Sequence, residues 1–167
     1  MLVDMDPGFR DYVVARSPAM LRTAYLLTGN RQEAEDLLQE ALLRLAGSWR
    51  RISHETTVDA YLRRTMVNLR TSRWRKRRVR SVPVSAVPDI AVFDPALEDL
   101  PARHAIWAAL SELPPRMRAV LVLRFYEDLS EVDTAAVLEC SVGNVKSQTS
   151  RALDKLRAAL PERSHLC

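Results

Sequence analysis

The sequence predicts an all-α protein made of two small helical domains joined by a flexible acidic linker. The 167 residues include only 4 glycines, and aromatic residues make up 6% of the chain, which argues against a turn-rich β-sandwich or barrel. Leu, Ala, Arg and Glu dominate the composition, and all four are good helix formers. With 47% hydrophobic and 28% charged residues, the chain is typical of a globular protein rather than a disordered one.

Composition and spacing also exclude several classes of protein. No apolar run is long enough to span a bilayer and no cleavable leader is visible, so we expect a cytoplasmic chain without membrane insertion. Cys140 and Cys167 lie far apart, and His54, His104 and His165 are scattered. None of these residues stands at metal-ligand spacing or within a matched catalytic set. We therefore expect no disulfide scaffold, no metal, no cofactor and no enzymatic activity.

The first domain is predicted at residues 8–80 and begins with a helix from Phe9 to Leu27. Gly29 suits the left-handed position that follows a helix. Asn30 then caps a second helix, with Glu33 as its reciprocal capping partner, and this helix ends near Ser48. Its apolar residues recur at steps of three and four, which indicates one buried face. They are Ala34, Leu37, Leu38, Ala41, Leu42 and Leu45.

A third helix is predicted after a loop at residues 50–57. It starts near Val58 and carries a buried stripe into a strongly cationic block. The buried positions are Val58, Tyr61, Leu62, Thr65, Met66 and Leu69. Between Arg63 and Arg80 there are nine Lys and Arg residues and no acid, so this helix is the main cationic feature of a chain whose net charge is +4.

Residues 81–99 are predicted to form the linker. Pro83, Pro88 and Pro95 interrupt any helical period, and the segment is acidic. The second domain, residues 100–161, then holds four helices. The first runs from residue 99 or 100 to Ser111, and the second starts at Pro115 and continues through Phe125. Ser130 caps the third, which ends at Leu138, and the last runs from Val142 to Leu160.

The last two helices have the spacing of a helix-turn-helix. Ala135 is small where the helices cross, Leu138 precedes the turn, and Val145 locks the second helix. That second helix would expose polar side chains suited to the major groove of DNA. They are Asn144, Lys146, Ser147, Gln148 and Arg151. The alternative is an ordinary helical hairpin with a solvated polar face.

The cationic helix has three interpretations. It is a solvated charged face, a basic helix on an anionic membrane, or a nucleic-acid surface. Packing on neighbouring helices uses up its apolar stripe, which disfavours the membrane. Trp74 among the arginines offers a stacking surface, which favours nucleic acid. The acidic face of the second helix, with Asp36, Gln39 and Glu40, is by default a solvated surface.

Five segments together resemble the conserved regions of bacterial RNA polymerase sigma factors. The segments that resemble region 2 are 35–44 (EDLLQEALLR), 61–69 (YLRRTMVNL) and 75–78 (RKRR). Those that resemble region 4 are 110–118 (LSELPPRMR) and 143–147 (GNVKS). The order and separation of these motifs are similar to those of the minimal extracytoplasmic-function group, in its SigE-like actinobacterial branch. The resemblance implies a promoter-specificity subunit that catalyses nothing itself.

The resemblance also implies the partners and the residues that meet them. Core RNA polymerase would be bound through the clamp helices of its largest subunit and its flap region, and an anti-sigma factor is implied as a further partner. The residues that match the polymerase-binding positions are Asp36, Gln39 and Glu40. The minus-ten element would be bound as a separated strand by Arg63, Arg64, Asn68, Arg70, Arg73, Trp74, Arg75, Lys76 and Arg77. The minus-thirty-five duplex would be read by Ser141, Gly143, Asn144, Lys146, Ser147, Gln148 and Arg151.

Four residues of the second domain depart from the family pattern. Glu139 stands where the family usually has Gly in the turn, and a positive φ there would cost about 1 kcal/mol. Thr134 replaces a usual apolar residue, Asn144 a usual Thr and Gln148 a usual Arg.

The alternative function is a free-standing helix-turn-helix regulator that binds duplex DNA without polymerase. Such a regulator needs neither the acidic face nor the helix that carries Asn68.

Overall fold

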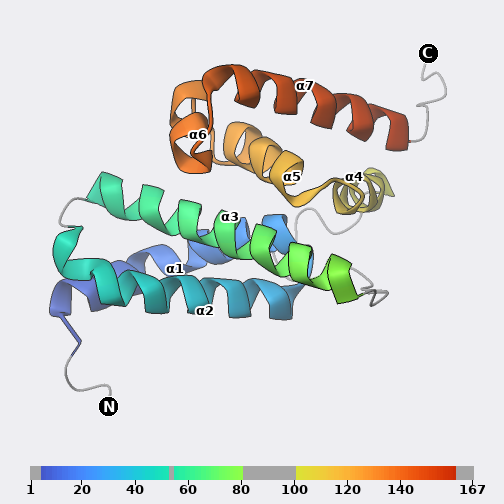
Figure 1. Ribbon diagram of the computed structural model, residues 1–167. Coiled ribbons are helices and arrows are strands. Elements are labelled where there is room, and N and C mark those ends of the chain that lie inside the picture. The colour runs from blue at the N-terminus through green and yellow to red at the C-terminus, as the bar shows by residue number, and fades with distance from the viewer. Residues whose placement is uncertain (1–4, 53–54, 81–100, 161–167) are drawn as a thin grey trace. The chain divides into compact units, whose positions relative to one another are not determined.

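The computed structural model describes residues 5–52, 55–80 and 101–160 (Figure 1). The chain divides into two compact units, Met1–Val84 and Ser85–Cys167. Regular structure in the described ranges consists of seven α-helices, one 3-10 turn and one π-helical turn, with no strand. The expected linker at 81–99 lies outside these ranges. None of the described helices is both long and apolar enough to cross a membrane.

Helix α1 (Pro7–Thr28) starts two residues before the predicted helix. The Asp6 carboxylate accepts hydrogen bonds from the backbone N–H groups of Gly8, at 2.8 Å, and Phe9, and Pro7 occupies the first helical position. At the other end Gly29 adopts φ 76°, so the predicted left-handed closure is confirmed.

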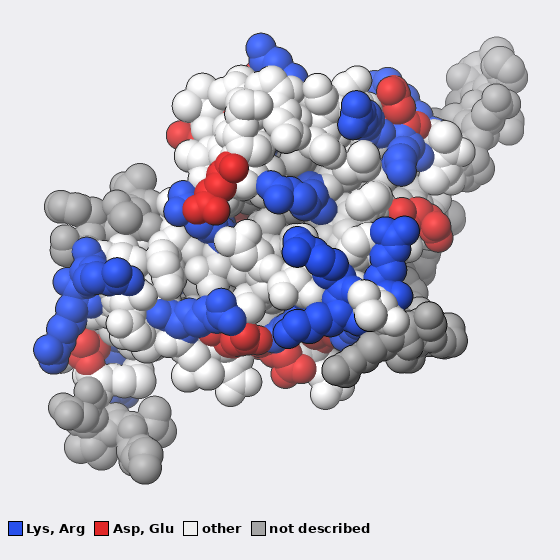
Figure 2. All heavy atoms as spheres, in the orientation of Figure 1, with Lys and Arg blue, Asp and Glu red and all other residues white. Residues whose placement is uncertain are grey.

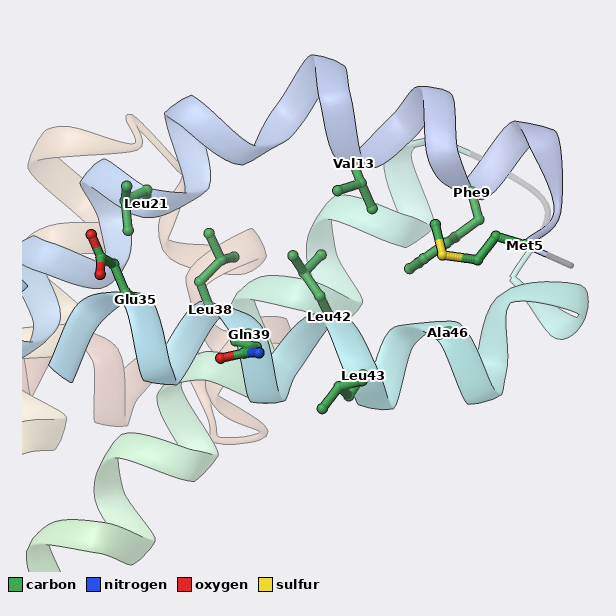
Figure 3. Close-up of a pocket in the computed structure, with 10 residues that line it drawn as sticks. All are labelled: Met5, Phe9, Val13, Leu21, Glu35, Leu38, Gln39, Leu42, Leu43 and Ala46. Carbon is green, nitrogen blue, oxygen red and sulfur yellow. The ribbon is translucent and has the colours of Figure 1, made fainter. Parts of the chain in front are cut away.

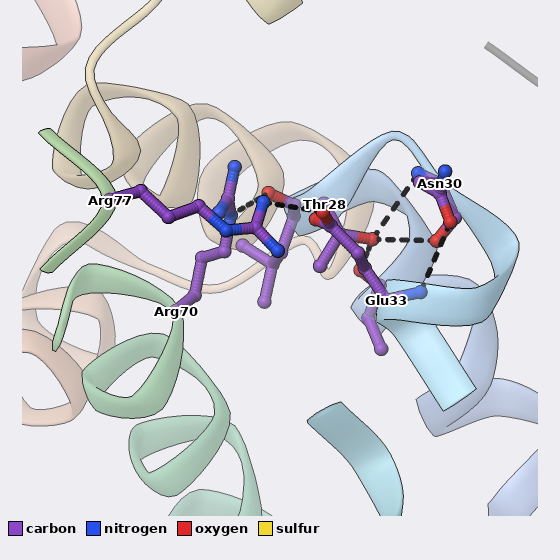
Figure 4. Close-up of polar contacts among 7 residues, drawn as sticks. Thr28, Asn30, Glu33, Arg70 and Arg77 are labelled. Atoms are coloured by element: carbon purple, nitrogen blue, oxygen red, sulfur yellow. Dashed lines mark hydrogen bonds and ion pairs between the residues drawn. The ribbon is translucent and has the colours of Figure 1, made fainter. Parts of the chain in front are cut away.

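Helix α2 (Arg31–Ser48) begins at the predicted cap, since the Asn30 side chain accepts a hydrogen bond from Glu33 N at 3.1 Å. The predicted reciprocal bond was wrong. The Glu33 carboxylate accepts a hydrogen bond from Arg77, and the Asn30 backbone N–H instead donates to the Thr28 hydroxyl at 3.5 Å (Figure 4). A charged partner on another helix thus displaces the weaker local bond to the backbone.

Helix α3 (Glu55–Arg80) starts three residues earlier than predicted, and the 3-10 turn η1 (Trp49–Arg51) occupies part of the expected loop. The Trp49 ring meets Phe9 edge to face with centroids 5.4 Å apart, which fixes the turn against α1. Helix α3 packs on both α1 and α2 (Figure 1). The largest fully buried residues of this unit are Met20, Leu27, Leu37, Leu45, Val58, Leu62 and Met66.

The second unit holds α4 (Pro101–Ser111), α5 (Pro115–Leu121), α6 (Glu131–Leu138) and α7 (Val142–Ala159). Helix α7 contacts α4, α5 and α6, and Leu113, Leu121 and Ala152 form a buried cluster in this unit. The helix predicted to run through Phe125 ends in a π-helical turn, η4 (Val122–Tyr126), closed by Glu127 N donating to Val122 O at 2.9 Å.

Candidate functional site

The outer face of α2 presents the residues predicted to bind polymerase. The opposite face of the helix buries Ala34, Leu37 and Ala41, which turns Asp36 and Gln39 to solvent. Asp36 has no ion-pair partner within the ranges that the structure describes. Leu43 lies on the same outer face and its residue surface is 68% exposed. The helix therefore offers an acid, an amide and a large apolar side chain together.

An apolar groove of about 390 Å³ lies beside this face, between α1 and α2 (Figure 3). Its apolar lining includes Phe9, Val13, Leu21, Leu38, Leu42 and Leu43, and Gln39 stands at its edge. Sequence reasoning missed this groove because it assigned Leu42 to the core. The signal that could have revealed it is Leu43, which falls on the helical face of Asp36 and Gln39 rather than on the buried one.

Glu40 differs from Asp36 because it is engaged within the molecule. It accepts hydrogen bonds from Arg73 Nη2 on α3 and, at 3.2 Å, from Arg44 Nη2 on its own helix. The hydrogen bond from Arg73 is the main reason that the pKa of the Glu40 carboxyl falls below its ordinary value of 4.5. The carboxylate is thus ionised at neutral pH and paired with two guanidinium groups.

The cations of α3 divide into two faces. Arg70, Arg73 and Arg77 repeat at steps of three and four and point toward α1 and α2. Arg70 Nε donates to Leu27 O near the end of α1 at 3.1 Å, and burial lowers the pKa of its guanidinium. Arg77 Nη1 donates to Glu33 Oε1 at 2.5 Å (Figure 4). This inner face thus contacts α1 through Arg70 and α2 through Arg73 and Arg77.

The outer face of α3 is exposed. Asn68, Ser72 and Arg75 lie on one stripe of the helix, nearly opposite Arg70, Arg73 and Arg77 at 100° per residue. Lys76 is also exposed. Figure 2 shows cationic side chains gathered along α3, with carboxylates of α2 beside them.

An aromatic side chain lies within the cationic block. Trp74 is half-buried, and the Arg78 guanidinium stands 5.2 Å from the centre of its ring. Because one face of the indole is covered by Arg78, a stacked base would have to approach the ring elsewhere or displace that guanidinium.

The start of α3 is fixed to α1 by a cluster around Asp59. Tyr12 donates its hydroxyl to Asp59 Oδ1 at 2.6 Å, and Arg16 donates to both carboxylate oxygens. Arg63, one of the predicted minus-ten residues, lies 3.9 Å from the same carboxylate, and Arg64 is half-buried. Burial is the largest cause of the raised pKa of the Tyr12 hydroxyl. These contacts hold the helix from which Asn68 projects.

In the second unit, α6 and α7 form the predicted hairpin, with Ala135, Leu138 and Val145 buried between them. The turn contains Glu139 at φ 53° and ψ 45°, so the family's usual glycine is replaced in a left-handed position. The Ser141 hydroxyl accepts a hydrogen bond from Asn144 N at 3.0 Å and thereby caps α7.

The predicted base-reading residues of α7 are not equally accessible. Gly143, Asn144, Ser147 and Arg151 are exposed. Lys146 Nζ is exposed but lies 3.7 Å from Glu131 Oε2 on α6. Gln148 is half-buried and its side-chain oxygen is enclosed. Helix α7 thus combines several exposed polar side chains with one amide, that of Gln148, whose oxygen is enclosed. Over the described part of the chain, no cluster of three His, Cys, Asp or Glu side chains could hold a metal.

Comparison with known proteins matches both units to one family. Residues 13–80 match the model described as Sigma-70 region 2, and residues 103–156 match Sigma-70, region 4. The RNA polymerase sigma-E factors of Streptomyces avermitilis and Streptomyces coelicolor are each 43% identical to 93% of this chain, covering 86% and 87% of those proteins. The ECF RNA polymerase sigma factor EcfG of Rhodopseudomonas palustris is 34% identical, covering 92% of this chain and 85% of that protein.

A solved structure agrees with these relatives. The sigma factor RpoE of Bartonella quintana, crystallised with the anti-sigma factor NepR, superposes with a TM-score of 0.74 at 25% identity, over 95% of this chain and 100% of that one. The chain therefore belongs to the extracytoplasmic-function group of RNA polymerase sigma factors, within the sigma-70 family.

Proposed function

We propose that the two units, taken as residues 8–80 and 100–161, give this sigma factor three separate binding surfaces. The outer face of α2 docks on core polymerase, the outer stripe of α3 holds the separated minus-ten strand, and α7 reads the minus-thirty-five duplex. One observation carries the proposal. Asp36 and Gln39 are exposed on one face of α2, Gln39 also lines the apolar groove, and a protein that only binds DNA has no use for such a face.

The docking face has the composition of a protein interface. Leu43 and the groove supply the apolar centre, and Asp36, Gln39 and Glu40 supply the polar rim. The clamp helices of the polymerase's largest subunit would cover the groove and pair cationic or amide groups with this rim. Fixed charges at the rim also orient the two proteins as they meet.

The strand-binding surface centres on Asn68. An amide side chain can both donate to and accept from the edge of an unstacked base, and unstacking costs about a few kcal/mol. Arg75 lies two turns further along the same stripe, where its charge can follow the phosphate backbone. Asn68 would therefore select the base while Arg75 and Lys76 hold the strand.

The recognition surface is the amino-terminal half of α7. Asn144, Lys146, Ser147 and Arg151 can reach base edges and phosphates once this helix enters the major groove. Ser141 and Gly143, at the start of the helix, suit backbone contacts to phosphate. Gln148 would need to turn outward before it could read a base, because its side-chain oxygen is enclosed.

Two further features belong to the proposal. Its action on RNA polymerase places the chain in the cytoplasm, where it catalyses nothing itself. By analogy with the Bartonella quintana sigma factor, we propose that an anti-sigma factor also binds this chain.

The test is co-elution with core polymerase followed by run-off transcription from a pool of genomic templates. We expect Asp36→Lys to abolish both, and Leu43→Arg to weaken both. Asp11→Lys is the matched control, because Asp11 is an exposed acid on α1 outside the proposed surfaces. If Asp36→Lys co-elutes as the unsubstituted chain does, the docking face is wrong. If the unsubstituted chain fails to co-elute but binds duplex DNA alone, the chain is a free-standing regulator.

A further inference from the structure

Two cations of α3 already have anionic partners inside the molecule. Arg73 donates to Glu40 and Arg77 donates to Glu33, and both glutamates belong to α2. The four side chains are between 22% and 43% exposed, so both pairs reach the surface. Because pairs at a solvated surface are weak, a competing anion can open them at little cost.

The bonding geometry favours such an exchange. A guanidinium binds phosphate and carboxylate oxygens through the same planar arrangement of N–H groups. Arg73 and Arg77 lie one turn apart on the carboxyl-terminal half of α3, on the face turned toward α2. A nucleic-acid backbone that reaches both must therefore cross the helix from the outer stripe of Asn68 and Arg75. A phosphate could therefore replace each carboxylate without any movement of the helix.

One of the two glutamates has a second role. Glu40 lies at the rim of the docking face, so a cationic group of polymerase and Arg73 compete for the same carboxylate. Glu33 lies two turns earlier on α2 and holds Arg77 beside the half-buried Arg70 (Figure 4).

We propose that Glu33 and Glu40 stand in for phosphate in the free protein, occupying Arg77 and Arg73, and that docking on polymerase draws Glu40 away and releases Arg73 to the separated strand. The first half concerns the free chain alone. The second half rests on the proposed function, because it needs the docking face.

The first half is tested by the binding of a fluorescein-labelled single-stranded DNA of mixed sequence to the full chain over a series of salt concentrations. We expect Glu40→Gln and Glu33→Gln each to bind several-fold more tightly than the unsubstituted chain. Each released arginine should steepen the slope of log affinity against log salt by about 0.7. Asp11→Asn removes the same charge from an exposed position on α1 and should leave that slope unchanged.

A second substitution locates the released group. Adding Arg73→Gln to Glu40→Gln should remove the gain, whereas adding Arg77→Gln should not. The reverse should hold for Glu33→Gln. Equal gains in Glu40→Gln, Glu33→Gln and Asp11→Asn would overturn the first half, because the effect would then follow net charge. The Glu33 and Glu40 variants are independent, so one remains informative if the other unfolds.

The second half is tested with holoenzyme. Arg73→Gln should lower strand affinity by a larger factor in holoenzyme than in the free chain, and equal factors would overturn the release. If the unsubstituted chain does not bind core polymerase, the proposed function and the release fail together. The comparison of Glu40→Gln with Asp11→Asn still decides the first half in that case.

Discussion

The two units use charged side chains in different ways. In the first unit, arginines cross between helices to reach Asp59, the Leu27 carbonyl and the carboxylates of α2. In the second unit, the ion pairs Lys146–Glu131 and Arg157–Asp154 lie at the surface. Arginine also packs inside the second unit, but on other partners: the buried Arg118 guanidinium lies 5.9 Å from the centre of the Trp107 ring, and Arg116 Nη2 donates to Leu138 O at 2.9 Å. Arginines therefore join helices in both units, largely through carboxylates in the first and through an aromatic ring and a backbone carbonyl in the second.

In the second unit, the residues that hold α7 in place differ from those proposed to read DNA. In the first unit, both kinds of residue lie on α3. The exposed groups of α7 can be replaced without loss of core packing, because Val145 and Ala152 hold that helix. On α3, arginines that contact the other helices stand beside those proposed to bind nucleic acid. Substitutions in the first unit must therefore be read with both stability and binding measured.

The largest expected effect comes from the Asp59 cluster. Asp59→Ala leaves the Tyr12 hydroxyl and the Arg16 guanidinium without their shared acceptor, and we expect a loss of about 2 kcal/mol in the free energy of unfolding. Thermal unfolding followed by tryptophan fluorescence should report it, because Tyr12 packs against Trp49. Asp11→Ala is the control, because Asp11 is exposed and directly precedes Tyr12 on α1. An equal loss in both variants would show that the cluster does not hold the helices.

Two substitutions, Arg70→Ala and Arg75→Ala, test the division of α3 into an inner and an outer face. Arg70 is largely buried against α1, so its loss should lower the free energy of unfolding by about 1 to 2 kcal/mol. Arg75 is exposed, so its loss should change stability by less than about 0.5 kcal/mol while weakening strand binding. Chemical denaturation and oligonucleotide binding measure the two quantities. Equal stability losses would contradict the division into faces.

The second unit contains a buried hydroxyl whose removal should be favourable. Thr134 is fully buried and its Oγ1 has no hydrogen-bond partner among the described residues, so Thr134→Val should raise the free energy of unfolding by about 1 kcal/mol. Thr65→Val is the matched control in the first unit, because the Thr65 hydroxyl donates to Tyr61 O at 2.8 Å. Denaturant unfolding should show a gain for Thr134 and none for Thr65. A gain at both positions would mean that the hydroxyl's pairing is irrelevant.

Most of the fold follows from local signals in the sequence. The caps at Asn30 and Ser130 and the left-handed Gly29 were predicted, because each depends on residues within one helical turn. The π-helical turn η4 was not, since a one-residue shift in hydrogen bonding leaves no mark in the apolar period. The positive φ at Glu139 was anticipated as a departure from the family's glycine.

The candidate site was less predictable. The run of Lys and Arg residues in the sequence identified the cations of α3. It did not show which of them bond to other groups of the protein, because those partners lie on other helices. Arg70 is 43 positions from Leu27, and Arg77 is 44 positions from Glu33. The groove beside Gln39 likewise depends on how α1 crosses α2. Their roles in binding remain predictions for the experiments above.

Glu139 and Asp128 of the second unit have positive φ, and we expect replacement by glycine to stabilise the chain by different amounts at the two positions. Glu139→Gly removes the clash of Cβ at φ 53°, and we expect a gain of about 0.5 to 1 kcal/mol in stability. Asp128→Gly, at φ 54°, should gain less, because Asp tolerates this region better than Glu. Thermal unfolding of the two variants measures the difference. A larger gain at Asp128 would contradict this ordering.

The smallest expected effect is the pH dependence of the Glu40 pair. The hydrogen bond from Arg73 lowers the pKa of Glu40 in the folded chain, so its contribution is present above the unfolded value of 4.5 and is lost as pH falls through the folded value. The side chain is 39% exposed, so solvent screening limits the contribution to about 0.5 kcal/mol.

Glu40→Gln should therefore be slightly less stable than the unsubstituted chain at pH 6, and the difference should shrink as pH falls below 4.5, as measured by denaturant unfolding. High salt should remove the difference at pH 6, because it screens exposed pairs. If the difference does not shrink below pH 4.5, the amide has disturbed packing rather than charge.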